Sequence, residues 1–599
     1  MCGIVGFTGK GNAVDFLTDG LRLLEYRGYD SAGITVSGDK FETVKTTKRI
    51  QSLKEKAKNI KGITGIGHTR WATHGGATEQ NAHPHLSNNE KFAVVHNGII
   101  ENYAELREEL MSDGFVFYSE TDSEVIPNLL QKYYKGDIKT AVLNTLCRLK
   151  GSYALGILCL DSPNTLIAAK SFSPLIIGIG ENENYISSDI SALKARADRA
   201  IYLNDGELAL ITNDNVVLYD SQGKEVPVKI TLIEPDDDSA QMGDFPHFML
   251  KEIYEQPRIL SNMLNSYIKN GEVFINSLSS DIKKFDRIDI VACGSAYHVG
   301  VAAKYIFEEL LHKRVSVDLA SEYRYRKPIT DSKTLTIAIS QSGETADTVW
   351  AITEAKRNKS HTLSIVNVKQ STLSRITDDV IYTLAGAEIS VATTKGYLTQ
   401  LAVIYLLAVL WADRLGTVSA EKLNGILSEL EKIPQKIDTV LDNTEKIKAM
   451  AQRLKNAETV FFIGRNTDFA ICLEAALKLK EISYIHAESY PAGELKHGTI
   501  SLIEEGTAVI ALCCNEKTLD KTISNIKEVA ARGGFILACT EDSSPHIPAN
   551  EIIVIPQTDN LLAPLIEVIP FQLLAYYTAL YRGCDIDKPR NLAKSVTVE

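Results

Sequence analysis

The feature that most constrains this chain is a strand and helix pattern that occurs twice in its second half. Short apolar segments alternate there with long amphipathic stretches, which is typical of parallel sheets covered by helices on both faces. Three such segments recur about 170 residues later. The equivalent segments are 288–292 and 460–463, 335–339 and 508–512, and 362–366 and 535–538. We therefore predict two α/β domains with doubly wound parallel sheets that arose by duplication, although any two domains of this class share such a pattern.

The loop after the second predicted strand differs between the two copies. In the first copy, residues 340–345 read Ser-Gln-Ser-Gly-Glu-Thr and open a helix. Hydroxyls, free backbone N–H groups and the positive end of the helix dipole favour an anion there. The equivalent loop, residues 513–517, has no hydroxyl and no glycine. The loops predict one phosphate site per chain, in the first copy, with plain helix capping as the alternative.

Residues 2 to about 235 carry a different pattern, in which short strands are interrupted by a few helices. Segments 3–7 and 92–96 have the composition of strands, whereas 102–113 and 123–134 have that of helices. This order predicts an α+β domain of layered sheets. Residues 234–243 are acidic and small and lack periodicity, so we expect a linker there.

Charge and cysteine content exclude several classes of protein. The 599 residues carry a formal net charge of −12 without long charged runs, so we expect no nucleic acid and no membrane partner. Nine scattered cysteines without CxxC pairs argue against a disulfide framework or structural zinc. The longest apolar run, 401–412, is shorter than the roughly 20 residues that span a bilayer, and no signal peptide is visible. We expect a cytoplasmic protein.

The opening Met1-Cys2-Gly3-Ile4 introduces the first candidate chemistry. Removal of Met1 would leave Cys2 with a free α-amine, which can act as the base for its own thiol. A cysteine at position two is by itself weak evidence for an N-terminal nucleophile. It is followed in order by GHTRWATHG (67–75), HNG (96–98) and TDSE (121–124). With these motifs the first domain resembles the class II glutamine amidotransferases, which are N-terminal-nucleophile enzymes.

The resemblance implies a role in glutamine hydrolysis for each motif residue. Cys2 attacks the side-chain amide, and Asn97 with the Gly98 N–H stabilises the oxyanion. Arg70 holds the substrate carboxylate and Asp122 its α-ammonium group. The residues expected to bind glutamine are Arg70, Trp71, Thr73, His74 and Asp122.

Three features of this domain have ordinary structural alternatives. Trp71 matches a tryptophan that gates an internal ammonia channel in the family, and the alternative is a core tryptophan. Asn97-Gly98 alone would fit a hairpin turn. The spacing of four histidines matches no short ligand motif, so we expect no metal. These histidines are His68, His74, His83 and His85.

A helix predicted over 468–485 carries a second candidate site. At 100° per residue, Glu474, Lys478 and Glu481 fall within a stripe of roughly 60°, and apolar side chains cover most of the rest. A helix that is apolar around most of its girth is buried, so its charged stripe is expected to face a polar cavity. An exposed i,i+4 ion pair is the alternative.

The duplicated half resembles tandem sugar-isomerase (SIS) domains, which bind phosphosugars. With the first domain and the final DKPRNLAKSVTVE (587–599), the whole chain resembles a family of glutamine-dependent hexose-phosphate aminotransferases in its short, bacterial form. This resemblance implies L-glutamine and D-fructose 6-phosphate as substrates and D-glucosamine 6-phosphate and L-glutamate as products. Isomerisation consumes no electrons, so no cofactor is expected.

The same resemblance implies roles in the second half. His497, reaching in from the neighbouring subunit of a homodimer, opens the sugar ring, and Lys594 on the C-terminal tail forms an imine with the ketose. Glu481 moves a proton between C1 and C2. Ala296 departs from the serine of bacterial relatives and is not assigned to the site. The residues expected to bind the sugar phosphate are Ser295, Ser340, Gln341, Ser342, Thr345, Val391, Thr393 and Lys478.

We expect an amidotransferase domain over 2–220, a linker and helical connector over 221–278, SIS domains over 279–419 and 451–589, and a catalytic tail over 590–599. A deglycase or an amidotransferase for another phosphosugar is the rival enzyme. A phosphosugar-sensing regulator with an inactive glutaminase is the rival of another class. The presence of Cys2, Glu481 and Lys594 argues against the regulator, because a sensor needs affinity without reactive groups.

Overall fold

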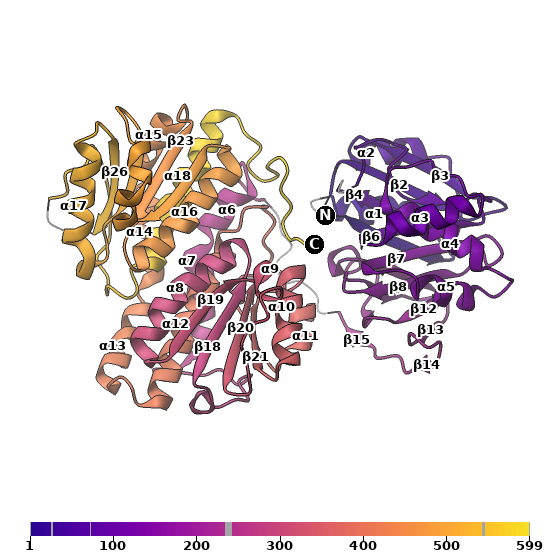
Figure 1. Ribbon diagram of the computed structural model, residues 1–599, viewed down its shortest axis with the longest axis horizontal. Coiled ribbons are helices and arrows are strands. Elements are labelled where there is room, and N and C mark those ends of the chain that lie inside the picture. Colours follow the sequence, from indigo (N-terminus) through magenta and orange to yellow (C-terminus); the bar gives the residue numbers. More distant parts are fainter. Residues whose placement is uncertain (1, 26–27, 72–73, 234–241, 542–545, 598–599) are drawn as a thin grey trace. The chain divides into compact units, whose positions relative to one another are not determined.

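A computed structural model describes residues 2–25, 28–71, 74–233, 242–541 and 546–597. The described chain forms two compact units. The first comprises residues up to 233 together with 595–597, and the second comprises residues 242–594. Figure 1 draws the residues up to 233 in indigo to purple and the residues from 242 onward in magenta to yellow. Most of the expected linker, residues 234–241, lies outside the described residues.

The first unit is built on two antiparallel sheets. Its strands are β1 (Gly3–Gly9), β2 (Ser31–Val36), β3 (Glu42–Thr46), β4 (Thr64–Arg70), β5 (His85–Leu86), β6 (Phe92–Ile100), β7 (Gly151–Cys159), β8 (Leu166–Ser171), β9 (Ile176–Ile179), β10 (Glu183–Ser187), β11 (Arg199–Tyr202), β12 (Leu208–Ile211), β13 (Val216–Tyr219), β14 (Glu225–Val226) and β15 (Thr231–Leu232). The orders are β15-β11-β9-β10-β1-β4-β2-β3 and β14-β13-β12-β8-β7-β6-β5. Buried apolar side chains of both sheets, among them Ile4, Ile66, Val95 and Leu158, form one core between them.

Helices cover the outer faces of both sheets. The helices are α1 (Ala13–Leu23), α2 (Ile50–Ala57), α3 (Tyr103–Ser112), α4 (Val125–Tyr133) and α5 (Ile138–Leu146), with short 3-10 turns η1 (Asp122–Glu124) and η2 (Ile190–Ala192). Residues of α1 and α2 pack with β1, and residues of α3, α4 and α5 pack with β6 and β7. Central strands are therefore buried on both faces, and every residue of β1 is buried, without alternation of buried and exposed positions. The predicted α+β class with layered sheets is confirmed.

The second unit contains two parallel sheets of five strands each. The first sheet has β18 (Arg287–Ala292), β19 (Arg314–Leu319), β20 (Thr334–Ser340), β21 (His361–Val366) and β22 (Asp379–Tyr382); the second has β23 (Thr459–Gly464), β24 (His486–Pro491), β25 (Ala508–Leu512), β26 (Phe535–Glu541) and β27 (Glu551–Ile555). The orders, β19-β18-β20-β21-β22 and β24-β23-β25-β26-β27, are the same. The prediction of two doubly wound α/β domains is confirmed. In this order, ligands bind where β18 and β20 end, because the chain leaves these neighbouring strands toward opposite sides.

Long helices join the two copies into one core. The helices are α6 (Phe248–Tyr254), α7 (Gln256–Tyr267), α8 (Gly294–Leu311), α9 (Ala320–Tyr323), α10 (Ala346–Arg357), α11 (Thr372–Ile376), α12 (Lys395–Leu415), α13 (Ala420–Leu430), α14 (Ile433–Asp442), α15 (Glu445–Leu454), α16 (Thr467–Ser483), α17 (Leu519–Ala530) and α18 (Pro564–Arg582). The remaining elements are the hairpin β16 (Ile268–Lys269) and β17 (Glu272–Val273), and 3-10 turns η3 (Ile282–Lys284), η4 (Ala492–His497), η5 (Thr499–Leu502) and η6 (Glu516–Thr518). Apolar residues of α8, α12, α16 and α18 meet in one cluster with both sheets.

Helix α12 extends the apolar run seen in the sequence. Among the described residues, it is the one helix with the length and hydropathy to cross a membrane, and 78% of its most apolar window is buried inside the structure. This burial is what the shared core of the two copies requires, because α12 packs on α8, α7 and α18. The length and apolar composition of α12 are thus explained by its packing inside the second unit.

Candidate active sites

The Cys2 thiol lies at the start of β1, against the end of β4. The antiparallel register pairs Gly3 with Thr69, which brings Cys2 beside Trp71. The Trp71 N–H donates to Cys2 Sγ at 3.3 Å, and the Trp71 carbonyl lies 3.6 Å from the same sulfur. Burial raises the pKa of the Cys2 thiol, while the Trp71 N–H and the Arg70 charge oppose this rise. A thiol with a raised pKa needs a base before it can attack.

Asn97 and Gly98 lie on β6, a strand of the other sheet of this unit. Asn97 is buried, and its Nδ2 donates to the Cys2 carbonyl oxygen at 3.1 Å. Gly98 has φ +130°, and a Cβ there would collide with the Ser152 carbonyl oxygen on β7. Only glycine fits this position, because both the backbone conformation and the close approach exclude a side chain. The amide of Asn97 is thereby fixed beside the nucleophile.

Arg70 and Asp122 lie in the same region of the first unit. The buried Arg70 guanidinium donates to the carbonyls of Gly76 at 3.0 Å, Gly75 at 3.1 Å and His74. Asp122 accepts a hydrogen bond from the Ile100 N–H at 2.8 Å, and its other oxygen lies 3.9 Å from His74 Nδ1. The structure therefore connects Arg70, His74 and Asp122 around one loop. Thr73 lies outside the described residues.

Four histidines form a buried cluster beneath this site: His68, His83, His85 and His96. His68 and His83 stack with ring centroids 4.1 Å apart, and His96 Nδ1 lies 2.8 Å from Ser123 Oγ. Burial lowers the pKa of all four, that of His68 to about 3, so they are neutral at physiological pH. Among the described residues, no group of three or more His, Cys, Asp or Glu side chains is placed to hold a metal ion.

The predicted phosphate loop of the second unit follows β20 and opens α10. Ser340 Oγ accepts the Gly343 N–H at 3.1 Å and lies 3.1 Å from Thr345 Oγ1, while Ser342 Oγ accepts the Glu344 N–H at 3.2 Å. Gly343 has φ +67°, and a Cβ there would collide with Ser371. The loop is a compact turn of hydroxyls and N–H groups at a helix N-terminus, the arrangement that favours an anion.

The equivalent loop of the second copy is closed by a side chain of the protein. Asp468, buried in the first turn of α16, accepts the N–H groups of Cys514 at 3.1 Å and Asn515 at 3.2 Å. Its carboxylate thus takes the hydrogen bonds that an anionic ligand would need. The second copy offers no open phosphate loop here.

The charged stripe of α16 faces the protein interior and not solvent. Lys478 Nζ lies 2.5 Å from Glu481 Oε2 and 3.5 Å from Glu474 Oε1, and the Lys478 and Glu474 side chains are 1% and 0% exposed. The alternative of an exposed ion pair is wrong. Although burial lowers the pKa of Lys478, Glu481 and Glu474 raise it above its usual value, so this lysine stays charged.

Ser295 and His298 connect the stripe to the first copy. Both project from α8, and Glu474 accepts the Ser295 hydroxyl at 2.9 Å and contacts His298 Nδ1 at 2.9 Å. The Ser295 hydroxyl therefore points to Glu474 in α16. A hollow of about 220 Å³ beside this contact is lined by residues of both helices, including Gly294, His298 and Lys480.

Lys594 is buried against an acidic residue that the sequence did not single out. Its Nζ lies 2.6 Å from Glu388 Oε2. Glu388 also accepts the N–H groups of Thr394 and Gly396 at 2.9 Å, and the Thr393 hydroxyl at 2.8 Å, at the start of α12. Burial raises the pKa of Glu388, but Lys594 and these N–H groups outweigh it and bring it down to about 2. The pair is therefore fully charged.

The tail that carries Lys594 is held at two further points. The Asp587 carboxylate accepts the N–H groups of Phe248 and Met249 at the start of α6, and the Asp587 carbonyl accepts the Val391 N–H at 3.0 Å. The Arg590 N–H donates to Tyr484 Oη at 2.7 Å. Val391 and Thr393 thus lie beside the tail. His497 in η4 is exposed.

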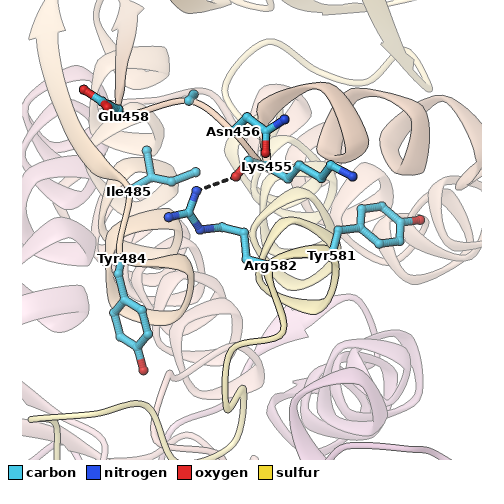
Figure 2. Close-up of a pocket in the computed structure, with 8 residues that line it drawn as sticks. Lys455, Asn456, Glu458, Tyr484, Ile485, Tyr581 and Arg582 are labelled. Atoms are coloured by element: carbon cyan, nitrogen blue, oxygen red, sulfur yellow. Dashed lines mark hydrogen bonds between the residues drawn. The ribbon is translucent and has the colours of Figure 1, made fainter.

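Another hollow of the second unit lies apart from these residues. It measures about 750 Å³. Figure 2 shows the Arg582 guanidinium turned toward the Lys455 carbonyl, which accepts its hydrogen bond. None of the predicted site residues that the structure describes lines this hollow, so its size does not indicate the site of the chemistry. Its lining consists of Lys455, Asn456, Ala457, Glu458, Tyr484, Ile485, Tyr581 and Arg582.

Comparison with known families agrees with this division. Residues 68–195 match the glutamine amidotransferase domain, and residues 281–410 and 453–582 match the SIS domain. A solved C-terminal domain of glucosamine-fructose-6-phosphate aminotransferase from Francisella tularensis is 36% identical, with a TM-score of 0.57, and covers 58% of this chain and 100% of that chain. The chain is a glutamine amidotransferase joined to two SIS domains.

Full-length relatives define the family more narrowly. The glutamine–fructose-6-phosphate aminotransferases (isomerizing) of Caldanaerobacter subterraneus subsp. tengcongensis, Clostridium tetani and Thermus thermophilus are 49%, 48% and 44% identical to it. Each alignment covers 100% of this chain and 100% of the relative. The chain belongs to the glutamine–fructose-6-phosphate aminotransferase (isomerizing) family, and is thus an enzyme that transfers nitrogenous groups.

Proposed function

We propose that the chain converts L-glutamine and D-fructose 6-phosphate to L-glutamate and D-glucosamine 6-phosphate with one set of residues in each unit. The first unit releases ammonia from glutamine, and the second transfers it to the sugar and isomerises the product. Glucosamine 6-phosphate then enters amino-sugar synthesis. The observation that carries the proposal is the presence, in one chain of this family, of a thiol beside a fixed amide and a buried lysine beside a carboxylate.

In the first unit, Cys2 attacks the glutamine side-chain carbon. Its sulfur forms a bond to this carbon, and the Asn97 amide with the Gly98 N–H stabilises the oxyanion. The C–N bond then breaks, the nitrogen leaves with a proton as ammonia, and water releases glutamate. Because burial raises the thiol pKa, the free α-amine of a processed Cys2 acts as the base. Arg70 and Asp122, with Thr73 and His74, bind the amino acid end of the substrate.

In the second unit, the loop 340–345 holds the phosphate through Ser340, Gln341, Ser342 and Thr345. The Lys594 amine attacks the C2 carbonyl of the opened ketose and expels water, which gives an imine. Ammonia then displaces the lysine. Glu481 removes a proton from C1 and returns it to C2, which converts the fructosimine to the 2-amino aldose. Lys478, Val391, Thr393 and Ser295 complete the pocket around the sugar.

Ring opening is assigned to His497 of a second subunit. The exposure of His497 in its own chain supports this proposal, because a general acid must reach the sugar ring oxygen. We therefore propose a homodimer in which each isomerase site is completed by the neighbouring chain. All nine cysteines are free thiols, which suits the reducing cytoplasm as its location.

Trp71 is proposed as the gate for ammonia. Ammonia that enters water at neutral pH is protonated and loses its nucleophilicity, so coupling requires a path without solvent. The Trp71 backbone is fixed at Cys2, and its ring packs edge-on against Tyr29 with centroids 5.7 Å apart. Replacement Trp71→Ala is expected to keep glutamine hydrolysis but to lower the yield of amino sugar per glutamate formed.

The overall reaction is tested with glutamine labelled with ¹⁵N at the amide. Incubation with fructose 6-phosphate should give labelled glucosamine 6-phosphate and glutamate in equal amounts. Glucose 6-phosphate without label, release of sugar nitrogen as ammonium, or binding without turnover would each contradict the proposal. Mass spectrometry of the sugar phosphates distinguishes these results.

A further inference from the structure

His68 contacts the amide that we assign to the oxyanion. It lies on β4, is fully buried, and its Nε2 is 3.0 Å from Asn97 Oδ1 and 3.0 Å from the His96 carbonyl oxygen. On the other side, Asn97 Nδ2 is 3.1 Å from the Cys2 carbonyl oxygen. The Asn97 amide is thus held between a histidine ring and the backbone of the nucleophile.

Two carbonyl oxygens fix the direction of every hydrogen bond in this chain of contacts. A carbonyl can only accept, so the His96 carbonyl requires a hydrogen on His68 Nε2. For the same reason the Cys2 carbonyl requires the NH₂ edge of Asn97 on its side. The remaining contact then joins a donor, His68 Nε2–H, to an acceptor, Asn97 Oδ1. An amide rotated by 180° would place like groups against each other at both ends.

We propose that His68 is a positioning residue for glutamine hydrolysis, which holds Asn97 with its NH₂ edge toward the reacting carbonyl. An oxyanion needs a donor, and a rotated amide would present an oxygen to the developing negative charge. The proposal rests on the assignment of Asn97 to the oxyanion. His68 itself touches no substrate.

The surroundings of His68 keep it in one state. Burial lowers its pKa to about 3, so the ring stays neutral at the pH of catalysis. His68 stacks on His83 with an interplanar angle of 18°, and His83 Nδ1 in turn accepts the His96 N–H at 3.2 Å. The ring is therefore packed as well as hydrogen-bonded, and the donor at Nε2 does not move away.

Two isosteric replacements separate positioning from packing. His68→Gln places an amide NH₂ near the former Nε2, whereas His68→Asn reaches only the former Nδ1. Removal of one oxyanion donor lowers kcat by about 10²–10³-fold, so a misoriented Asn97 in His68→Asn should lower glutaminase kcat by about 10- to 100-fold. His68→Gln should stay within about fivefold of the parent, and KM for glutamine should change little in either variant.

A double-mutant cycle with Asn97→Ala makes the test specific. Once Asn97 is absent, His68→Asn should cause no further loss of kcat, because coupled residues are non-additive. His85→Asn serves as the control, since His85 is equally buried in the cluster but bonds to Thr121. Isomerisation of fructose 6-phosphate in the absence of glutamine should be unchanged in all variants and reports on the intact second unit.

The outcomes separate the inference from the assignment on which it depends. If Asn97→Ala keeps the parent kcat, the oxyanion assignment of Asn97 is wrong. If Asn97→Ala loses activity but His68→Asn and His68→Gln behave alike, or if their losses add to that of Asn97→Ala, the positioning role of His68 is wrong. A loss in His85→Asn as large as that in His68→Asn also overturns it.

Discussion

The two α/β copies of the second unit have the same strand order but differ in the loop at which a ligand would bind. In the first copy, the loop after β20 presents hydroxyls and N–H groups at the start of α10. In the second copy, Asp468 accepts the N–H groups of Cys514 and Asn515 in the equivalent loop. Asp468 lies nine residues after the start of β23, and Ala296 lies nine residues after the start of β18. The equivalent position thus carries a methyl group in the first copy and, in the second, the carboxylate that accepts the loop N–H groups.

This difference shows that the two copies of a duplicated fold contribute different parts of one site. The first copy keeps the anion loop, while the second contributes the buried charged stripe of α16. The chain after the second copy returns Lys594 to Glu388 at the end of the first. We infer that chemistry is concentrated at one crevice, and four predictions test this asymmetry, from the largest expected effect to the smallest.

Replacement of Lys594 should cause the largest loss. Without its amine no imine forms, so Lys594→Ala is expected to lower glucosamine 6-phosphate formation by at least about 1,000-fold, while glutamine hydrolysis persists. Lys594→Arg is the matched control, because it keeps a cation beside Glu388 but cannot form the imine. If Lys594→Arg retains a tenth of the parent rate, the imine role is excluded.

Glu388→Gln removes the charge that holds this lysine. We expect glucosamine 6-phosphate formation to fall by about 10- to 100-fold, and loss of one partner of a buried pair to cost about 3 kcal/mol of stability. The folded pKa of Glu388 lies below its usual value, at about 2. The stabilisation is therefore present above about pH 4.5 and is lost as the pH falls toward about 2.

Denaturant unfolding of the parent and Glu388→Gln across this range measures the effect. Their difference in unfolding free energy should shrink on acidification and should also vanish in a Lys594→Met background. A difference that is independent of both pH and Lys594 would assign Glu388 only to capping of α12.

The sequence predicts a functional residue where its chemical type and its spacing from nearby residues together indicate the role. The strand repeats, the hydroxyl loop at 340–345 and the stripe of Glu474, Lys478 and Glu481 all depend on neighbours in the chain, and the structure places them as local periodicity requires. Glu388 has no such pattern, because its partner Lys594 is 206 residues away. The contact of Ser295 with Glu474 likewise depends on how α8 packs on α16, and no spacing within either helix encodes it.

The two loops provide a paired test of the open crevice. Ser342 and Asn515 occupy equivalent loop positions, because they lie seven residues after Leu335 and Ala508, which pair with Ile288 and Val460 of the neighbouring strands. Ser342→Ala should raise KM for fructose 6-phosphate by about tenfold, consistent with loss of one or two hydrogen bonds to a charged group. Asn515→Ala should leave KM unchanged. Equal changes in KM for the two variants would show that the loops do not differ in function.

The smallest effect concerns the carboxylate that closes the second copy. Burial raises the pKa of Asp468 to about 7, and burial together with Asp468 raises that of Glu567 on α18. A carboxyl whose folded pKa is raised favours folding at low pH, and this contribution is lost as the pH rises from about 4 through about 7.

Asp468→Asn keeps an oxygen for the N–H groups of Cys514 and Asn515 but cannot ionise. We therefore expect Asp468→Asn to raise the free energy of unfolding, relative to the parent, by about 1–3 kcal/mol more at pH 8 than at pH 4. KM for the sugar phosphate should not change. Urea unfolding at both pH values measures this difference, and Glu567→Gln should reduce it. A pH-independent difference would mean that Asp468 is ionised throughout, as a permanent substitute for the phosphate that the first copy binds.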